Sequence, residues 1–418
     1  MYLDFAATNK ISQIWIDSII ESNSKGLFGN PGSYHKAGFD ALDMMENSTS
    51  HILNNIFETP EIAKDYDICF NSGSTESINQ FFNMYYQENI KNNNKTLFIY
   101  ENVAHKAVLK CIKKYFPEDN FELDFSLSIE DNLENLKNTL ENVKTEGNKF
   151  YDKCVLVLTS VNNETGGIWK PELINQINKI YCEYKDISTV FTTKIIDVFL
   201  DHTQGFMKHN ENLELADAFC FSAHKIGGMK SFGGLVYKKD FKEFLEKYPL
   251  IVGGYEIRGG TKDPISIKAL EKLVNDKYIK HNIYIGKVRN LYNIILNKIF
   301  EISKKYNVSI TLNNKSDFFK MEQSPYIINA SFIGIEGESL MSSLMDDCIS
   351  TGSACNSSEL KTSHVLSGMG IKKLYANCAF RISLSEEVDE DELKDFLDNR
   401  FEPAIKFLAR MRTRHGEE

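Results

Sequence analysis

The chain has 418 residues, 42% of them hydrophobic and 25% charged, and a formal net charge of −10. This length exceeds one ordinary hydrophobic core, so we expect two domains, and the negative charge argues against nucleic acid as a direct partner. No apolar run approaches the roughly 18 residues that cross a membrane and no secretion or transit signal is visible, so we expect a cytoplasmic protein that does not enter the membrane.

Strand-like and helix-like segments alternate along the first part of the chain. Strands are predicted at residues 68–70, 96–100, 155–159, 195–200, 218–221 and 235–237, and helices at residues 76–82, 104–115 and 128–147. Continuous apolar runs such as residues 155–159 suit the interior of a parallel sheet. The alternation therefore predicts an α/β fold with a mostly parallel central sheet.

A glycine-rich stretch at residues 253–261 separates this part from the rest of the chain. A long helical pattern follows at residues 265–304, and an acidic helix is predicted at residues 386–410. We place the domain boundary at the glycine-rich stretch. The expected domains are a large one at residues 13–262 and a small one formed by residues 1–12 and 263–418.

The 8 cysteines form no CxxC pair with the spacing of metal ligands, so we expect no metal site, and a reducing compartment disfavours disulfides. Cys69, Cys154 and Cys220 lie in apolar runs, which is typical of buried, inert thiols. Cys355 differs because residues 350–358 are rich in Gly, Ser, Ala and Asn, the composition of an exposed loop. From this loop alone, a thiolate nucleophile and a solvent-facing cysteine without function are about equally supported.

Three features upstream predict a cofactor. Lys225 closes the run Ser-Ala-His-Lys at residues 222–225, directly after a strand, where it can point into a cleft; the alternative is an ordinary surface lysine. Asp201 ends the preceding strand, and Thr203 would face the same side of the sheet. Residues 72–76 lie between a strand and a helix, where N–H groups bind anions, although such turns also cap many helices. A lysine for a Schiff base, an aspartate for a pyridinium nitrogen and a phosphate cradle together predict pyridoxal phosphate (PLP).

With these residues the chain resembles the cysteine desulfurases of the class V aminotransferase fold, of the group I (NifS/IscS-like) type. The matching segments run in family order nearly from end to end, and the ordered set is more specific than any one motif. They are residues 2–8 (YLDFAAT), 29–33 (GNPGS), 71–77 (NSGSTES), 101–108 (ENVAHKAV), 161–166 (VNNETG), 201–204 (DHTQ), 222–225 (SAHK), 350–357 (STGSACNS) and 380–383 (FRIS). The resemblance implies fold type I of the PLP-dependent transferases, with a smaller C-terminal α/β domain that carries the cysteine loop.

The resemblance also implies a role for each matched position. Three catalytic residues are implied: Lys225 would bind PLP and move protons at the substrate α-carbon, His105 would stack on the cofactor ring and could move protons, and the Cys355 thiolate would attack the substrate sulfur. Arg381 and Asn163 would bind the carboxylate of L-cysteine, a task that suits a bidentate guanidinium. The implied cofactor-binding residues are Ser74, Thr75, His105, Asn163, Asp201, Gln204, Ser222, His224, Lys225 and Thr261, the last of which would reach the phosphate of the neighbouring subunit in a homodimer.

The implied reaction converts L-cysteine to L-alanine and leaves a persulfide on Cys355. The sulfur would then pass to an acceptor protein, either an iron–sulfur scaffold or a tRNA-thiolation enzyme. A selenocysteine lyase or a transaminase on the same fold is the alternative, since fold does not fix function. A degenerate relative that only binds a partner is a third interpretation, and the intact Lys225, Asp201 and Arg381 argue against it.

Three features depart from the family pattern. His202 stands where the family usually has a small residue, and strand alternation predicts that it faces away from the cofactor. The glycine-rich stretch at residues 253–261 is shorter than its family counterpart. The chain also continues only briefly after its last predicted helix, where related enzymes bind an iron–sulfur scaffold, so the sequence does not name the sulfur acceptor.

Overall fold

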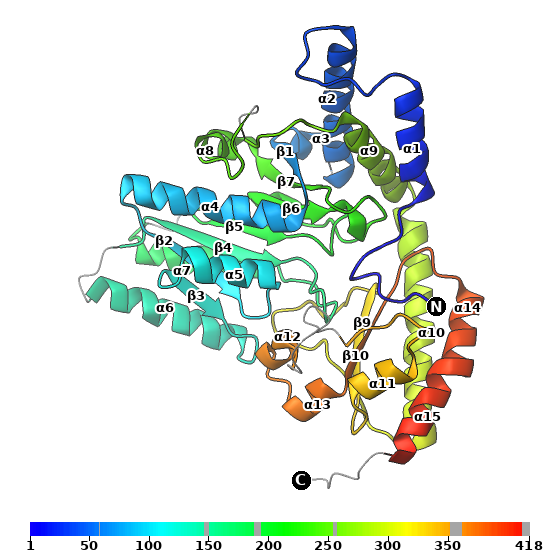
Figure 1. The fold of residues 1–418 in the computed structure, drawn as a ribbon. Helices are drawn as coiled ribbons and strands as arrows, with labels where there is room; N and C mark the ends of the chain where they lie inside the picture. Colours follow the sequence, from blue (N-terminus) through cyan, green and yellow to red (C-terminus); the bar gives the residue numbers. More distant parts are fainter. Residues whose placement is uncertain (58, 146–149, 188–193, 254–256, 352–361, 412–418) are drawn as a thin grey trace.

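The computed structural model describes residues 1–57, 59–145, 150–187, 194–253, 257–351 and 362–411. These residues form two α/β units, each with its own sheet and its own buried apolar cluster (Figure 1). The N-terminal segment, drawn in blue, runs from helix α1 (Gln13–Ser24) toward the smaller unit, where the chain begins (Figure 1).

The larger unit is built on a seven-stranded sheet with the order β1-β7-β6-β5-β4-β2-β3. All neighbours from β6 to β3 are parallel, and only β7 is antiparallel to the strands on both its sides. The predicted α/β fold with a mostly parallel central sheet is therefore confirmed. The strands are β1 (Tyr66–Asn71), β2 (Thr96–Glu101), β3 (Asn120–Leu123), β4 (Lys153–Thr159), β5 (Asp197–Asp201), β6 (Ala218–Ser222) and β7 (Gly233–Lys238).

Helices cover both faces of this sheet, because successive side chains of a buried strand point to opposite sides. In β4, Val155 and Val157 pack with α4, α5 and α8, whereas Leu156 and Leu158 pack into the core that includes α2, α6, α7 and α9. The helices of this unit are α2 (Lys36–Ile56), α3 (Pro60–Ala63), α4 (Ser74–Asn92), α5 (Lys106–Tyr115), α6 (Ile129–Thr145), α7 (Glu172–Tyr184), α8 (Lys242–Lys247) and α9 (Pro264–Ile279).

The smaller unit packs helices against an antiparallel sheet with the order β10-β9-β8. Leu3 and Phe5 from the N-terminus join its apolar core. Its strands are β8 (Ile310–Leu312), β9 (Ile327–Phe332) and β10 (Ala379–Ser383). Its helices are α10 (His281–Tyr306), α11 (Gly337–Ser343), α12 (His364–Gly368), α13 (Lys373–Asn377), α14 (Glu390–Phe396) and α15 (Glu402–Met411), the last two joined by a π-helical turn, Leu397–Phe401.

The helical pattern predicted at residues 265–304 is two helices that meet at Lys280. Helix α9 contributes Leu270 to the core of the larger unit, and α10 contributes Val288 to the core of the smaller one. The break thus marks where the chain passes from one apolar core to the other. The assignment of the domain boundary to the glycine-rich stretch stays a prediction.

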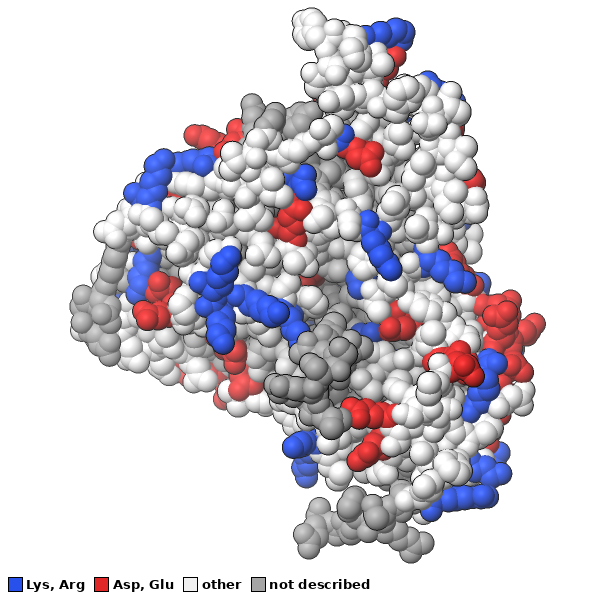
Figure 2. All heavy atoms as spheres, viewed as in Figure 1, with Lys and Arg blue, Asp and Glu red and all other residues white. Residues whose placement is uncertain are grey.

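Charges of both signs are interspersed on the face of the molecule drawn in Figure 2, and acidic side chains gather over α14. This distribution fits the net charge of −10. Among the described residues, no helix combines the length and the apolar character needed to cross a bilayer.

Candidate active site

Polar side chains from two strand ends and one helix start meet at the carboxyl edge of the seven-stranded sheet. β5 ends at Asp201 and β6 ends at Ser222, and the turn after β1 begins helix α4 at Ser74. Gly73 makes this close approach possible, because its φ is +124° and a Cβ would lie 2.8 Å from Ser222 Oγ. Open α/β sheets bind their ligands at this edge.

Hydroxyl groups join the turn to the strand ends. The Ser74 amide donates a hydrogen bond to Ser222 Oγ at 2.9 Å, and the two hydroxyl oxygens lie 3.0 Å apart. Thr203 Oγ1 lies 2.6 Å from Ser74 Oγ. The N-cap residue of α4 is Gly73, which has no side chain to cap the helix, and Thr75 is exposed beside the turn. An uncapped helix start surrounded by hydroxyls fits a phosphate group.

Asp201 is buried, and one of its two carboxylate oxygens accepts hydrogen bonds from neighbouring residues. Its Oδ1 accepts hydrogen bonds from Thr203 N at 3.1 Å, from the Thr203 hydroxyl, and from Cys220 Sγ at 3.5 Å. None of the hydrogen bonds found among the described residues reaches Oδ2, so this oxygen fits a protonated ring nitrogen. His202, the next residue, contacts Ser160 Oγ at 2.9 Å instead, as strand alternation predicts, and burial lowers its pKa to about 4.

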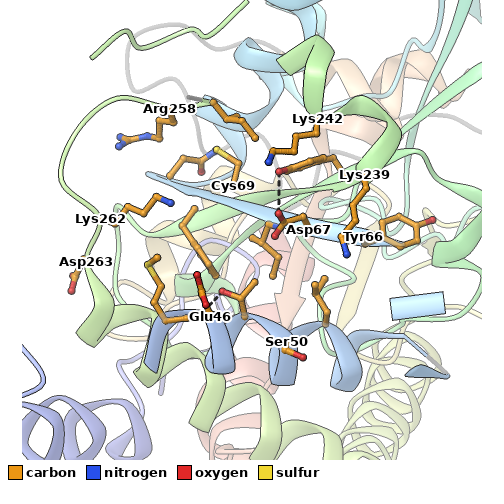
Figure 3. A pocket seen from close by; sticks show the side chains of 18 of the residues that line it. Glu46, Ser50, Tyr66, Asp67, Cys69, Lys239, Lys242, Arg258, Lys262 and Asp263 are labelled. Carbon is orange, nitrogen blue, oxygen red and sulfur yellow. Dashed lines mark hydrogen bonds between the residues drawn. The ribbon is translucent and has the colours of Figure 1, made fainter. Parts of the chain in front are cut away.

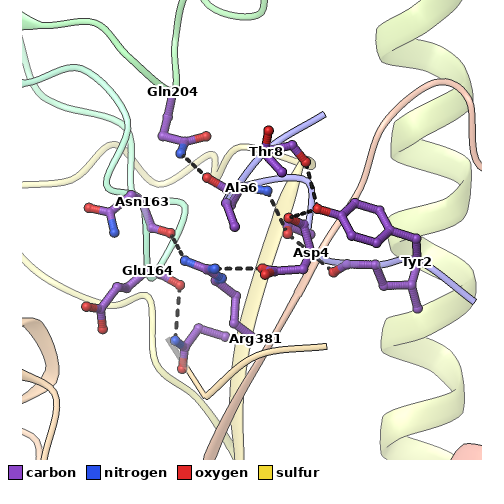
Figure 4. Close-up of polar contacts among 12 residues, drawn as sticks. Tyr2, Asp4, Ala6, Thr8, Asn163, Glu164, Gln204 and Arg381 are labelled. Carbon is purple, nitrogen blue, oxygen red and sulfur yellow. Dashed lines mark hydrogen bonds and ion pairs between the residues drawn. The ribbon is translucent and has the colours of Figure 1, made fainter. Parts of the chain in front are cut away.

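Lys225 lies in the single turn that follows β6, and the N-terminal segment holds its amine. Lys225 Nζ donates to the carbonyl oxygens of Ala6 at 2.7 Å and Ala7 at 2.8 Å. Gln204 Nε2 donates to the same Ala6 oxygen at 2.8 Å (Figure 4). Burial, assisted by the positive charge of Arg381, lowers the pKa of Lys225 to about 8. This lowered pKa increases the fraction of free amine, the form that attacks a carbonyl carbon, relative to an ordinary lysine.

The two predicted histidines occupy different positions relative to this lysine. His105 is the N-cap of α5, and its Nδ1 accepts a hydrogen bond from Ala107 N at 3.2 Å. Burial lowers its pKa, and the charges of Asp201 and Lys225 act on it in opposite directions. A half-buried, neutral imidazole results. His224 Nδ1 lies 3.1 Å from Thr8 Oγ1, so it contacts the N-terminal segment.

Arg381 lies in β10 of the smaller unit, close enough to Lys225 for its charge to act on the pKa of that lysine. Its Nη1 donates to the carbonyl oxygen of Asn163 at 2.7 Å, and its Nη2 pairs with Asp4 Oδ1 at 2.8 Å (Figure 4). Its Nε is buried without a hydrogen-bond partner. Because a buried guanidinium rarely leaves a donor unsatisfied, this N–H indicates a position for a carboxylate ligand.

Two of the predicted site residues are not among those that the structure places near Lys225 and Arg381. Cys355 lies outside the described residues. Thr261 is exposed and lines a separate cavity of about 980 Å³ between α2, β1 and the stretch around residues 258–263 (Figure 3). Asn71 and Ser72 from the turn after β1 also line this cavity, whereas Lys225 does not. The cavity is therefore adjacent to the candidate phosphate site and does not include the predicted catalytic lysine.

The N-terminal segment is what reasoning from the sequence missed. The sequence patterns predicted no role for Asp4 or for the Ala6 carbonyl, and they did not connect Cys220 with Asp201. The signal was present, because residues 2–8 already matched the family in order. Their distance along the chain from Lys225 and Arg381 concealed the contact, which only the fold makes visible.

Comparison with known proteins places these residues in a family. The family model described as Aminotransferase class-V matches residues 1–396. Cysteine desulfurase IscS of Buchnera aphidicola subsp. Schizaphis graminum is 31% identical over 411 residues, covering 94% of this chain and 90% of that protein. The mitochondrial cysteine desulfurase of Saccharomyces cerevisiae is 28% identical over 427 residues, covering 98% of this chain and 76% of that protein. The crystal structure of a NifS-like protein from Rickettsia africae superimposes with a TM-score of 0.74 at 21% identity, covering 97% and 99% of the two chains.

The chain therefore belongs to the aminotransferase class-V family. At the level of the family, its relatives support a PLP-dependent cysteine desulfurase. The residues at the sheet edge fit PLP: an uncapped helix start with two serine hydroxyls for the phosphate, a buried aspartate oxygen for the ring nitrogen, and a lysine amine of lowered pKa for the aldehyde.

Proposed function

We propose that this chain is an active cysteine desulfurase, which converts L-cysteine to L-alanine and carries the released sulfur on Cys355. The observation that carries the proposal is that Lys225 from the larger unit and Arg381 from the smaller unit both bind the same N-terminal segment. A lysine and a carboxylate-binding arginine that are far apart in the sequence lie near each other in the fold. This arrangement supports a site for an α-amino acid.

Each of these side chains has a proposed role in the reaction of such a substrate. PLP, when bound, supplies the electron sink that makes bonds at the substrate α- and β-carbons easier to break. Arg381 orients the substrate through its carboxylate, and the carbonyl of Asn163 fixes the guanidinium. Lys225, with its pKa lowered to about 8, takes and returns the proton at the α-carbon. His105, whose pKa is lowered by burial, would stack on the cofactor ring as a neutral imidazole.

The sulfur leaves through the predicted cysteine nucleophile. The Cys355 thiolate forms a sulfur–sulfur bond with the substrate sulfur, the Cβ–S bond breaks, and the electron pair of that bond stays on Cβ, which takes up a proton. Cysteine thus becomes alanine, and Cys355 becomes a persulfide. A second acceptor then takes the outer sulfur; an iron–sulfur scaffold and a tRNA-thiolation enzyme are the proposed acceptors, in the cytoplasm.

We also propose that two copies of the chain share their active sites. Thr261 is exposed, and the neighbouring Arg258 is tied to the phosphate turn through Glu76, 2.5 Å from its Nε. The segment between α1 and α2 exposes apolar side chains, with Tyr34 96% and Phe28 64% exposed. A second copy would cover such side chains and bring Thr261 to the phosphate site of its neighbour. The measurement is the mass of the native protein, and an active monomer would refute shared sites.

The main experiment measures products from L-cysteine under reductant. Protein loaded with PLP should release sulfide and L-alanine in equal amounts, and Cys355→Ser should reduce sulfide release at least about a hundredfold while leaving PLP bound. Cys348→Ser is the matched control, because Cys348 is exposed and has no assigned role. Full activity of Cys355→Ser would exclude the persulfide route. Parallel assays with selenocysteine and with pyruvate as amino acceptor separate the lyase and transaminase alternatives.

A further inference from the structure

Arg381 carries a charge that the free protein must neutralise within its own fold. Its side chain is buried on β10, and in the described part of the chain Asp4 is the carboxylate with which it forms an ion pair. Glu164 lies near enough for the guanidinium to act on its pKa, but burial raises the pKa of Glu164 to about 7, and its carboxyl is engaged by the Ser363 hydroxyl. Asp4 is therefore the carboxylate in direct contact with Arg381, whereas Glu164 is bound by Ser363.

The main chain around Asp4 is fixed beside the strand that carries Arg381. Ser383 N donates to Leu3 O at 2.8 Å, and Ala6 N donates to Ser383 Oγ at 2.9 Å. The Tyr2 hydroxyl closes the turn by donating to Thr8 O at 2.8 Å (Figure 4). These contacts hold the backbone on both sides of Asp4, so its position relative to β10 does not depend on the ion pair.

The Asp4 carboxylate itself is held much less firmly than its backbone. Its side chain is 20% exposed, whereas that of Arg381 is 5% exposed, and the hydrogen bond found for it is the one from Arg381 Nη2. Rotation of this short side chain toward solvent would free Nη2. The buried Nε, which has no partner, and Nη2 then form the fork that binds a carboxylate through two hydrogen bonds.

We propose that Asp4 is an exchangeable counter-ion, displaced from Arg381 when the carboxylate of an amino-acid substrate binds and returning when the product leaves. This proposal rests on the proposed function, because it takes Arg381 as the substrate-binding arginine. The exchange keeps the buried guanidinium neutralised in both states. It also imposes selectivity, since a ligand has to bring a carboxylate of its own to compensate for the lost ion pair. Asp4 thus competes with the ligand carboxylate for Arg381 and weakens substrate and product binding alike.

The test compares two ligands that differ in the carboxylate alone. L-Alanine and ethylamine are titrated calorimetrically into the PLP-loaded protein and into Asp4→Asn, whose amide oxygen can still accept from Nη2 but carries no charge. L-Alanine should bind Asp4→Asn about tenfold more tightly than the unmodified protein, and the affinity for ethylamine should not change. Asp4→Glu, which keeps the charge, should bind L-alanine as weakly as the unmodified protein.

The location of the effect is tested in a second background. In Arg381→Gln, adding Asp4→Asn should leave the affinity for L-alanine unchanged, because the competition for the guanidinium is gone. Weaker L-alanine binding by Asp4→Asn would overturn the proposal, since Asp4 would then only orient Arg381; equal changes for both ligands would overturn it as well. Sulfide release from L-cysteine is measured separately, so absence of desulfurase activity would remove the proposed function while the titrations still decide the role of Asp4.

Discussion

The candidate active site has a cofactor side and a substrate side, and the polar groups of the two sides find their hydrogen-bond partners in different ways. The cofactor side consists of Ser74, Asp201, Thr203 and Ser222. The substrate side consists of Asp4, Ala6, Lys225 and Arg381. On the cofactor side, short side chains at strand ends bond to one another, and the contacts within the described residues leave one oxygen of Asp201 open. On the substrate side, two cations are bound by groups of the N-terminal segment.

This difference indicates which groups move when ligands bind. The cofactor side is arranged before binding, because its hydroxyls are carried by strand ends and a helix start within one buried sheet. The substrate side has to exchange partners, since Lys225 must leave the carbonyls of Ala6 and Ala7 to react with an aldehyde. We therefore expect substitutions on the two sides to affect different measured constants.

The largest effect is expected for Lys225→Ala, because this residue belongs to the substrate side and reacts with the cofactor. Desulfurase activity should fall by about a thousandfold or more, since both the covalent hold and the proton transfer are lost. Borohydride reduction followed by mass spectrometry should show PLP attached to Lys225 in the unmodified protein and no attachment in the variant. Lys230→Ala, at an exposed lysine in the following turn, is the matched control and should retain attachment.

Arg381→Gln is expected to affect substrate binding without affecting the cofactor. Charge-assisted hydrogen bonds to a carboxylate are lost, so the KM for L-cysteine should rise by about 10- to 100-fold, while the affinity for PLP, measured at alkaline pH where the Lys225 amine is free in both proteins, stays unchanged. Kinetics across cysteine concentrations and fluorescence titration with PLP measure the two constants. A parallel loss of PLP affinity would show that the two sides are not independent.

The cofactor side could be predicted from the sequence because each of its residues is adjacent to a strand whose apolar pattern is visible. Ser222 ends β6 and Asp201 ends β5, so the sheet topology alone brings them to one edge. The partners of the substrate side could not be predicted in this way. Asp4 meets Arg381 through the packing of residues 377 positions apart, which no local pattern encodes.

The same limit explains the details that the sequence did not provide. The helical pattern after residue 265 is continuous in composition, and only packing onto two different cores breaks it at Lys280. Cys220 was predicted to be a buried, inert thiol, and burial does raise its pKa, but it also donates to Asp201. Periodicity predicts which side chains are buried and does not reveal their polar partners.

Ser222→Ala is expected to have a smaller effect, limited to the cofactor side. It removes the acceptor of the Ser74 amide and one hydroxyl of the phosphate site, so the affinity for PLP should fall by about 5- to 10-fold. The KM for L-cysteine, measured with saturating PLP, should not change. Ser160→Ala is the matched control, because the Ser160 hydroxyl bonds to His202 rather than to the phosphate site. A raised KM in Ser222→Ala alone would contradict the separation of the two sides.

The smallest expected effect is a shift in the pH dependence of PLP attachment to Lys225. This shift links the cofactor to Arg381 on the substrate side. Burial and the charge of Arg381 lower the pKa of Lys225 from 10.5 to about 8. The free amine of the apoprotein therefore forms as the pH rises through about 8, and the rate of PLP attachment should rise with it. The cost of burying the protonated amine is present in full below pH 8 and is relieved as the pH rises toward 10.5, so Lys225 contributes increasing stability across that range. In Arg381→Gln the midpoint of the attachment rate should move to higher pH, because a neighbouring positive charge is gone. Stopped-flow absorbance from pH 6 to 10 measures both midpoints, and a midpoint near 10.5 in the unmodified protein would mean that the N-terminal carbonyls and not the electrostatics of the cleft control this lysine.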